Sequence, residues 1–301
     1  MLAALAPVFA IILLGYALKR FGFPGDEFWP AAERATYYLF FPALLFGNLA
    51  RGDFGNLAAA PMALALAAAV ILVAGTLLVL RKRLPFDGPG FTSVFQGSIR
   101  PNTYVGLAGA AALYGPRGLT LAAMAIVTLI PLVNLLCVPT VSRYGSLGRK
   151  GLGASILEVA RNPLILSCAA GFVGGALALP FPRFLFDVVD ILARTALPLA
   201  LLAVGAGLRF GGMASRARGI AISSAAKLAI LPLLTLAGLR LLGVSGEPAV
   251  IAMLFTALPT SASSYILARQ LGGDHVLMAA IITFHTIVSV ATLPLLLSLA
   301  P

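Results

Sequence analysis

Residues 97–106 read GSIRPNTYVG and interrupt a stretch that is otherwise apolar enough to cross a membrane. Arg100 places a charge, Pro101 a helix breaker and Asn102 an amide in the middle of this stretch. Proline has no backbone N–H, and it disfavours helical geometry in the residue before it. We therefore expect a helix to stop near Arg100 and a second half-helix to begin at Pro101.

The surrounding composition is that of an integral membrane protein. The chain has 301 residues, of which 60% are hydrophobic and only 10% are charged, and its mean hydropathy is +1.01. Soluble globular chains carry about 25% charged residues. The formal net charge of +11 would indicate a nucleic-acid partner in a soluble domain. Here the placement of the basic residues explains the charge without nucleic acid.

The hydropathy pattern predicts ten membrane spans, because a helix needs about 20 apolar residues to cross a bilayer core. The predicted spans are 2–18, 31–50, 61–80, 90–114, 119–141, 162–179, 184–208, 220–242, 248–271 and 276–299.

Basic residues are concentrated in alternate loops. The loops after the odd-numbered spans, with the adjoining span ends, hold thirteen: Lys19, Arg20, Arg34, Arg81, Lys82, Arg83, Arg143, Arg149, Lys150, Arg161, Arg209, Arg216 and Arg218. The opposite loops hold four: Arg51, Arg117, Arg183 and Arg240. Cytoplasmic loops carry the excess of Lys and Arg. The bias predicts a multi-pass protein of the inner (plasma) membrane with both termini outside, on the periplasmic side. Lys19 and Arg20 follow the first apolar run, so that span is expected to stay uncleaved.

The two halves of the chain resemble each other. Pro7 and Gly15 in the first span match Pro163 and Gly171 in the sixth at a constant separation of 156 residues. Five spans in each half would invert the second half relative to the first. Inverted repeats with interrupted helices are typical of secondary transporters whose site lies near the bilayer midplane. Chance matches of the frequent residues Gly and Pro are the alternative.

The ninth span carries a second interruption, in the stretch ALPTSASSY at 257–265. Non-helical backbone at membrane depth survives only where protein or water covers it, and the N-terminus of a half-helix favours an anion. The two interruptions therefore predict a carboxylate site. The alternative is that the prolines only kink packed helices. The candidate binding residues are Arg100, Pro101, Asn102, Thr103, Pro259, Thr260, Ser261 and Ser263.

Of the other basic side chains within predicted spans, His285 in the tenth and Lys227 in the eighth are candidates for coupling. Either could carry a proton or a coupling charge, although a lone intramembrane histidine is more often a packing residue. Asp190 and Arg194, four residues apart, are expected to neutralise each other on one helix face. The broken spans contain no Asp or Glu, and we find no metal cluster, no phosphate loop and no nucleophile with a base. No cofactor, metal or enzymatic activity is therefore expected.

Several of these stretches together resemble the auxin efflux carrier family, which includes plant PIN proteins and many bacterial carriers. The PNT and ALP interruptions are the most specific of them. The stretches are YYLFFPALLFGNLA (37–50), RPNTYVGLAGAAALYG (100–115), NPLI (162–165), LPLALLAVGAGL (197–208), ALPTSASSYILARQLGGD (257–274) and SVATLPLLL (289–297).

The resemblance implies an all-α membrane protein with two inverted five-helix repeats, similar to bile-acid sodium symporters, whose broken fourth and ninth helices cross at the midplane. The substrate carboxylate would lie at the crossing, near Asn102 and Pro259. The implied division has scaffold helices at 1–51 and 162–210, which often form a homodimer, transport-domain helices at 61–141 and 218–299, and a short cytoplasmic loop at 142–161.

The resemblance also implies elevator-type export of small organic anions without sodium. The chain departs from the plant carriers at Ser264, where they have a second proline, and in the short loop at 142–161. The substrate, auxin-like or a small dicarboxylate such as malate or malonate, stays open, as do the direction of flux, the coupling ion, the oligomeric state and any contact of Arg100 with substrate. The alternatives are a sodium-coupled symporter of the same fold and a non-transporting membrane receptor.

Overall fold

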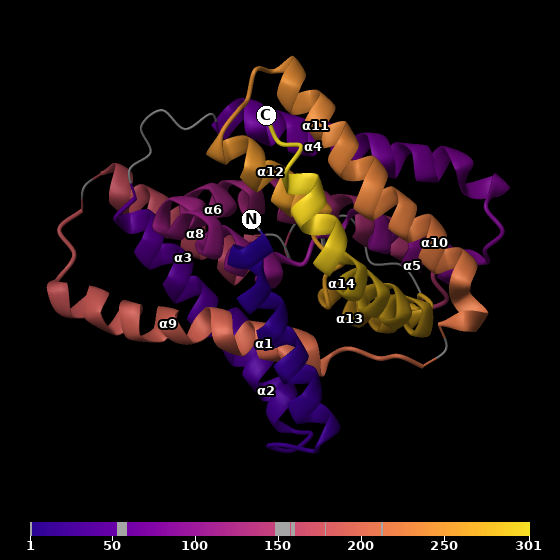
Figure 1. Cartoon of the computed structure of the whole chain (residues 1–301), viewed down its shortest axis with the longest axis horizontal. Helices are drawn as coiled ribbons and strands as arrows, with labels where there is room; N and C mark the ends of the chain where they lie inside the picture. Colours follow the sequence, from indigo (N-terminus) through magenta and orange to yellow (C-terminus); the bar gives the residue numbers. More distant parts are fainter. Residues whose placement is uncertain (1, 53–58, 148–156, 158–159, 178, 212) are drawn as a thin grey trace. The chain divides into compact units, whose positions relative to one another are not determined.

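The computed structural model describes residues 2–52, 59–147, 157, 160–177, 179–211 and 213–301 (Figure 1). Within these residues every regular element is a helix, and one isolated antiparallel bridge joins Pro101 to Thr260. The prediction of an all-helical membrane protein is therefore confirmed.

Six helical stretches of the described residues are long and apolar enough to cross a membrane. They are Ala3–Arg20, Ala59–Arg83, Thr103–Tyr144, Arg183–Ala206, Ala214–Leu241 and His275–Leu297. The ten-span inverted arrangement stays a prediction. The second predicted span is made of contiguous helical segments from Phe28 to Ala50, the fourth and ninth are divided at their interruptions, and the helix of the sixth, Pro163–Ala176, has only 14 residues.

By its internal contacts the chain divides into two compact units, and the first comprises residues 1–57, 104–127 and 160–207. Within it, α1 packs on α9, and α3 packs on both α8 and α9. Its elements are α1 (Leu2–Arg20), α2 (Phe28–Ala35), the π-helical turn η1 (Thr36–Phe40), α3 (Phe41–Ala50), the first part of α6 (Thr103–Tyr144), α8 (Pro163–Ala176) and α9 (Arg183–Ala206).

Glycines set the helix contacts of the first unit. A Cβ added at Gly15 of α1 would overlap the backbone of Leu202, and one at Gly205 of α9 would overlap the backbone of Ile12. Gly171 likewise lets α8 approach the backbone of Phe46 on α3. Close backbone approach at small residues is a common way for membrane helices to associate, since lipid supplies no hydrophobic driving force between them.

The principal partner of Asp190 is Arg51, while the neighbour Arg194 that the sequence suggested interacts with the Asp190 carboxylate only through its charge. Arg51, at the end of α3, forms two hydrogen bonds to the Asp190 carboxylate, one of them 2.9 Å long from Nη1 to Oδ2. The Arg51 guanidinium also lies over the ring of Phe186, and its Nε donates to the carbonyl of Gly47. The bidentate geometry explains why the long-range partner wins over the neighbour on the same helix.

The second unit comprises residues 58–103, 128–159 and 208–301. In it α5 and α14 pack against each other and against α10, and α4 packs on α5, α11 and α12. Its elements are α4 (Ala59–Val79), η2 (Leu80–Arg83), α5 (Gly88–Ile99), the rest of α6, η3 (Ala214–Arg216), α10 (Ala217–Ala225), the π-helical turn η4 (Ala226–Ile230), α11 (Leu231–Leu241), α12 (Glu247–Ala257), α13 (Ser263–Leu271) and α14 (His275–Leu297).

Each π-helical turn is followed by a proline at the second residue of the next helix, Pro42 after η1 and Pro232 after η4. A proline inside a helix removes a hydrogen bond and clashes with the carbonyl four residues before it. A wider turn ahead of the proline leaves that carbonyl room, and such bulges are frequent at functional sites. The turn η4 is the segment that carries Lys227.

The two units can be compared with the predicted scaffold and transport groups, but they do not test which group transports. Residues 104–127, expected in the transport group, group with the first unit. The expected loop at 142–161 falls largely outside the described residues. Which unit moves and which stays fixed remains a prediction.

Candidate functional site

The two proline interruptions lie against each other in the second unit. Helix α5 ends at Ile99 and α12 ends at Ala257, and the residues that follow them are extended. The Asn102 N–H donates to the Pro259 carbonyl at 2.9 Å, and the Ser261 N–H donates to the Arg100 carbonyl at 3.3 Å. The interruptions thus satisfy each other's backbone groups as two short antiparallel strands would.

This pairing also corrects one expected boundary. The second half-helix begins at Thr103, two residues after Pro101. Pro101 and Asn102 are taken up by the bridge to Thr260 and the bond to Pro259, so they are not available to the first helical turn. The corresponding half-helix after Pro259, α13, begins at Ser263.

Thr260 links the bridge between the two interruptions to helices α5 and α14. Its hydroxyl donates to the carbonyl of Gly97 in the last turn of α5 at 2.7 Å, and it also lies 2.9 Å from Nδ1 of His285 on α14. Thr260 and His285 are both fully buried. A buried polar group is costly unless it is hydrogen-bonded, so these contacts are what allow polar atoms to occupy the centre of the unit.

Arg100 is the charged member of the group. Its side chain is 9% exposed, and Nη2 donates to the Ser263 hydroxyl at 3.3 Å. Nη1 is buried and makes no hydrogen bond to the residues that the structure describes. Ser263 in turn contacts the Ser261 hydroxyl at 2.9 Å. The predicted residues from Arg100 to Asn102 and from Pro259 to Ser263 are therefore gathered in one place, with Thr103 at the adjoining helix start.

The two predicted coupling residues belong to the same unit. His285 joins the group directly through Thr260, and its Nε2 lies 3.0 Å from the Ser224 hydroxyl on α10. Lys227 is fully buried on η4, which packs against the helix of His285, α14.

Sequence reasoning did not single out Gln96, Ser223 and Ser224. Gln96 is fully buried one helical turn before Arg100, and Ser223 is fully buried one turn before Lys227. A Cβ at Gly97 would overlap Ser223 Oγ, so α10 lies directly against this part of α5. The sequence does contain a signal for two of them: Gln96 and Ser223 each lie four positions before a basic residue within an apolar stretch.

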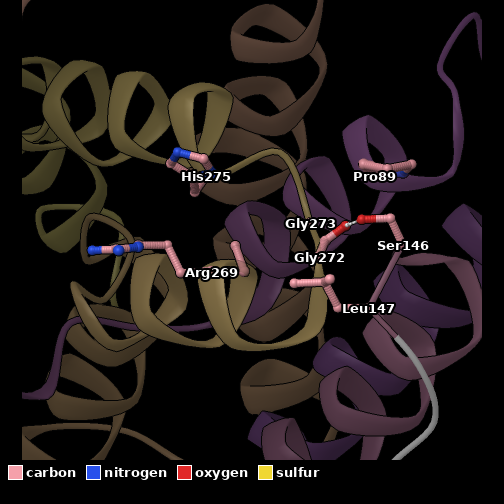
Figure 2. A pocket seen from close by; sticks show the side chains of 8 residues that line it. Pro89, Ser146, Leu147, Arg269, Gly272, Gly273 and His275 are labelled. Atoms are coloured by element: carbon pink, nitrogen blue, oxygen red, sulfur yellow. Dashed lines mark hydrogen bonds between the residues drawn. The ribbon is translucent and has the colours of Figure 1, made fainter.

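A cavity of about 330 Å³ lies at the opposite ends of α5 and α13 from the interruptions (Figure 2). It is lined from the start of α5 by Pro89, from the chain after α6 by Ser146, and from the α13–α14 turn by Gly272 and Gly273. The Arg269 side chain extends away from the glycine turn (Figure 2). The cavity contains none of the predicted binding residues.

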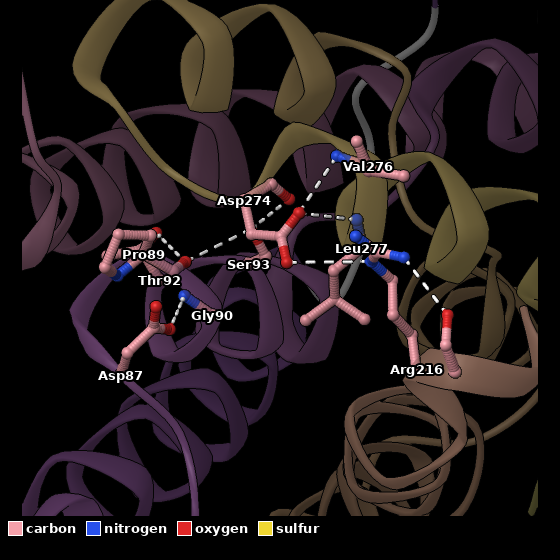
Figure 3. Close-up of polar contacts among 10 residues, drawn as sticks. Asp87, Pro89, Gly90, Thr92, Ser93, Arg216, Asp274, Val276 and Leu277 are labelled. Carbon is pink, nitrogen blue, oxygen red and sulfur yellow. Dashed lines mark hydrogen bonds and ion pairs between the residues drawn. The ribbon is translucent and has the colours of Figure 1, made fainter. Parts of the chain in front are cut away.

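Polar contacts fix the helix ends around this cavity (Figure 3). Asp274 accepts hydrogen bonds from the N–H groups of Val276 and Leu277 at the start of α14, and it forms an ion pair with Arg216 at 3.7 Å. Its carbonyl accepts the Ser93 hydroxyl of α5 at 2.8 Å. These contacts hold α5 and α14 in register with the turn before α14, and so help to position Gly97 in the last turn of α5 and His285 in the middle of α14.

The chemistry of the interruptions suits an anion. They bring together the Arg100 guanidinium, the Asn102 amide and hydroxyls that include those of Thr260, Ser261 and Ser263, and α5 and α13 contain no Asp or Glu. Carboxylates pair with guanidinium groups through short charge-assisted hydrogen bonds. Among the described residues, no group of three or more His, Cys, Asp or Glu is arranged to hold a metal ion.

Comparison with known proteins agrees with this architecture. A family model described as "Membrane transport protein" matches residues 148–297. A Rhizobium meliloti (strain 1021) protein named "Putative malonate transporter" is 28% identical over 97% of this chain and 93% of its own length. A Methanothermobacter thermautotrophicus protein named "Uncharacterized transporter" is 24% identical over 96% and 94%.

A plant relative extends the comparison. An Oryza sativa subsp. japonica protein named "Probable auxin efflux carrier component 5c" is 27% identical over 47% of this chain and 39% of its own length. The relatives are named as transporters and not as enzymes. The chain is an all-helical multi-pass membrane transporter, and these matches confirm the predicted resemblance to the auxin efflux carrier family.

Proposed function

We propose that this protein is a secondary transporter of small organic anions and that the substrate carboxylate binds where the two proline interruptions meet. The observation that carries the proposal is the pairing of Asn102 with Pro259 and of Ser261 with Arg100. It gathers a buried guanidinium, an amide and hydroxyls around non-helical backbone. Interrupted helices of this kind form substrate sites in many secondary transporters.

The Arg100 side chain supplies the charge complement for the substrate. A buried cation with an unused N–H is costly in a bilayer, and a bound carboxylate would offset that cost. The whole-length relative named for malonate transport makes a small dicarboxylate the first substrate to test. The absence of Asp and Glu from α5 and α13 supports sodium-independent transport, because a sodium site there would have to rely on carbonyls and hydroxyls alone.

The ten-span inverted arrangement is part of the proposal. Helix α6 has 42 residues, which at 1.5 Å per residue is about 63 Å, twice the thickness of a bilayer core of about 30 Å. Gly115 within it has φ +55° and ψ −136°, so the helix is interrupted there and can cross twice. The continuous helical stretch from Phe28 to Ala50 is similarly long enough for one crossing.

The transport cycle we propose is of the elevator type, in which helices 3–5 and 8–10 of the ten-span scheme move against a scaffold of the others. The interruptions fix each other through backbone bonds, so they would travel as one piece with α5 and α13. The scaffold helices would form a homodimer in the inner membrane, with both termini on the outside. The cavity at the far ends of α5 and α13 would then face the cytoplasm.

Malonate transport in proteoliposomes tests this function. Vesicles with the purified full-length protein should accumulate labelled malonate in exchange for internal malonate, and vesicles without protein should not. Replacing all sodium with potassium should leave the rate unchanged. Loss of exchange in potassium would support the sodium-coupled alternative.

A thermal-stability screen tests whether the protein binds carboxylates, independently of whether it transports them. Ligands that bind only the folded state raise its apparent stability with affinity and concentration. A panel of mono- and dicarboxylates should include stabilising compounds, with neutral amides of the same shape as the control. Stabilisation by none of the carboxylates would contradict the anion site, and binding without any flux would favour a receptor.

A further inference from the structure

Two basic side chains are buried together beside the interruptions. Lys227 is 0% exposed, and its Nζ makes no hydrogen bond to any described residue. His285 is also 0% exposed, and its helix α14 packs against η4, which carries Lys227. Two positive charges cannot both be accommodated cheaply in such a place. The pair therefore holds at most one charge at low cost.

The hydrogen bonds around His285 depend on how many protons its ring carries. The Thr260 hydroxyl bonds both the Gly97 carbonyl, at 2.7 Å, and His285 Nδ1, at 2.9 Å. The Ser224 hydroxyl bonds both the Ile220 carbonyl, at 2.7 Å, and His285 Nε2, at 3.0 Å. A carbonyl only accepts, and a hydroxyl has one proton to donate. All four bonds can therefore be made at once only when both ring nitrogens carry a proton.

A neutral His285 is accommodated by turning one hydroxyl. If Nδ1 is bare, Thr260 donates to it and gives up Gly97. If Nε2 is bare, Ser224 donates to it and gives up Ile220. Either state keeps three of the four hydrogen bonds, so a proton can arrive or leave without any movement of the helices.

We propose that Lys227 and His285 share one exchangeable proton and that this proton is taken up when an organic anion binds at the interruptions. Without the anion both side chains are neutral. When the anion binds, a proton from the solvent forms one new N–H bond, either on Lys227 or on His285, so that the total charge of the pair rises from 0 to +1. The proposal rests on the proposed function, because the anion is the substrate of that site.

On the described elements that pack against η4, no other charged side chain is buried beside Lys227 and His285. Those elements are α5, α10, α11, α12 and α14. Helix α5 has no titratable side chain, and Arg218 of α10 and Arg240 of α11 are exposed. Glu247 and His275 are the first residues of α12 and α14, and neither side chain is fully buried. Among the described residues of these five elements, His285 is the one buried titratable group.

Thr260 connects the proton to the substrate. It is the residue that bridges Pro101, and the direction of its hydroxyl depends on whether Nδ1 of His285 carries a proton. A proton on His285 brings positive charge to the interruptions, which favours an anion there. By linkage, the bound anion favours the proton to the same degree.

Proton uptake on binding tests the proposal directly. Malonate is added to purified full-length protein in weakly buffered detergent solution, at a pH where malonate itself is fully ionised, and a pH-indicator dye reports the protons taken up. The wild type should take up a measurable fraction of one proton per chain. The variants Lys227→Gln and His285→Gln should take up none, whereas the exposed-residue controls Lys82→Gln and His275→Gln should behave as the wild type.

The conservative variant Lys227→Arg distinguishes a proton-sharing role of Lys227 from a purely structural role. Arginine keeps the charge but does not release its proton in proteins, so uptake should also be lost in Lys227→Arg. Restoration of uptake by arginine would contradict a proton-sharing role. Wild-type protein that binds malonate and takes up no proton would overturn the inference while leaving the proposed function intact.

A measurement without substrate covers the case in which malonate does not bind, which would count against the substrate proposal alone. The chain has two histidines, so nitrogen-15 labelling of histidine gives ring signals that report the protons on each. Lys227→Gln should change the protonation state of His285 at a given pH and leave His275 unchanged. An unchanged His285 signal would overturn the shared proton.

Discussion

Single residues decide where the helices of this transporter stop. Pro101 and Pro259 act through local backbone rules that can be applied to the sequence directly, and the interruptions lie where those rules place them. What the rules could not give is the partner of each interruption. The bond from Asn102 to the Pro259 carbonyl joins residues 157 positions apart, and no local propensity encodes such a pairing.

Thr260 is the residue at which this pairing should be most sensitive to substitution. Thr260→Val keeps the shape but removes the hydrogen bonds to Gly97 and His285, and leaves their buried polar atoms without a partner. Losing a buried partner costs about 1–3 kcal/mol. We expect the free energy of unfolding in detergent micelles to fall by that amount and to recover in Thr260→Ser.

A matched control is available on α12. The hydroxyl of Thr256 is equally buried but bonds only carbonyls of its own helix, those of Ala252 and Met253. Thr256→Val should therefore cost less than Thr260→Val. Equal losses at the two positions would show that Thr260 has no special structural role.

At the scale of the helices, the sequence predicted the apolar segments well and their continuity poorly. Apolar periodicity cannot show where two segments join into one helix, as in α6, or where a π-helical turn divides a span, as at η1. The expected boundary between the fourth and fifth spans does coincide with Gly115, whose positive φ favours glycine. Turn chemistry was readable at that point because it is local.

The contact between α1 and α9 gives a test at this scale. In Gly205→Ala the added methyl group would overlap the Ile12 backbone, and overpacking of this kind typically costs about 1–3 kcal/mol. Gly75→Ala in α4 is the control, because a Cβ there meets nothing within 4 Å. Replacing an unhindered helical glycine by alanine favours the helix by up to about 1 kcal/mol.

The two glycine variants should thus change stability in opposite directions in the same unfolding assay. Gly205→Ala should lower the free energy of unfolding and Gly75→Ala should leave it unchanged or raise it. A stable Gly205→Ala protein would mean that α1 and α9 are not held at the distance that the structure shows.

For the whole molecule, the composition was enough to predict a membrane protein, and the family motifs were enough to predict a transporter. The buried polar network was not predictable in the same way. Lys227 was predicted from its place in an apolar span, but Gln96 and Ser223 are ordinary polar residues in their own helices. Their significance comes from being buried near Lys227 on the neighbouring elements α5, α10 and η4, which contain no Asp or Glu, and only the folded arrangement reveals it.

The central claim is that the paired interruptions hold the transported anion, and malonate exchange by an Asn102→Ala protein tests it most directly. The variant removes the amide but keeps the backbone N–H that bonds Pro259, so the fold should survive, with an unfolding temperature close to that of the wild type. The exposed Gln270→Ala is the control. We predict that exchange falls to the level of protein-free vesicles in Asn102→Ala and stays at the wild-type rate in Gln270→Ala. Wild-type exchange by a folded Asn102→Ala protein would contradict the account.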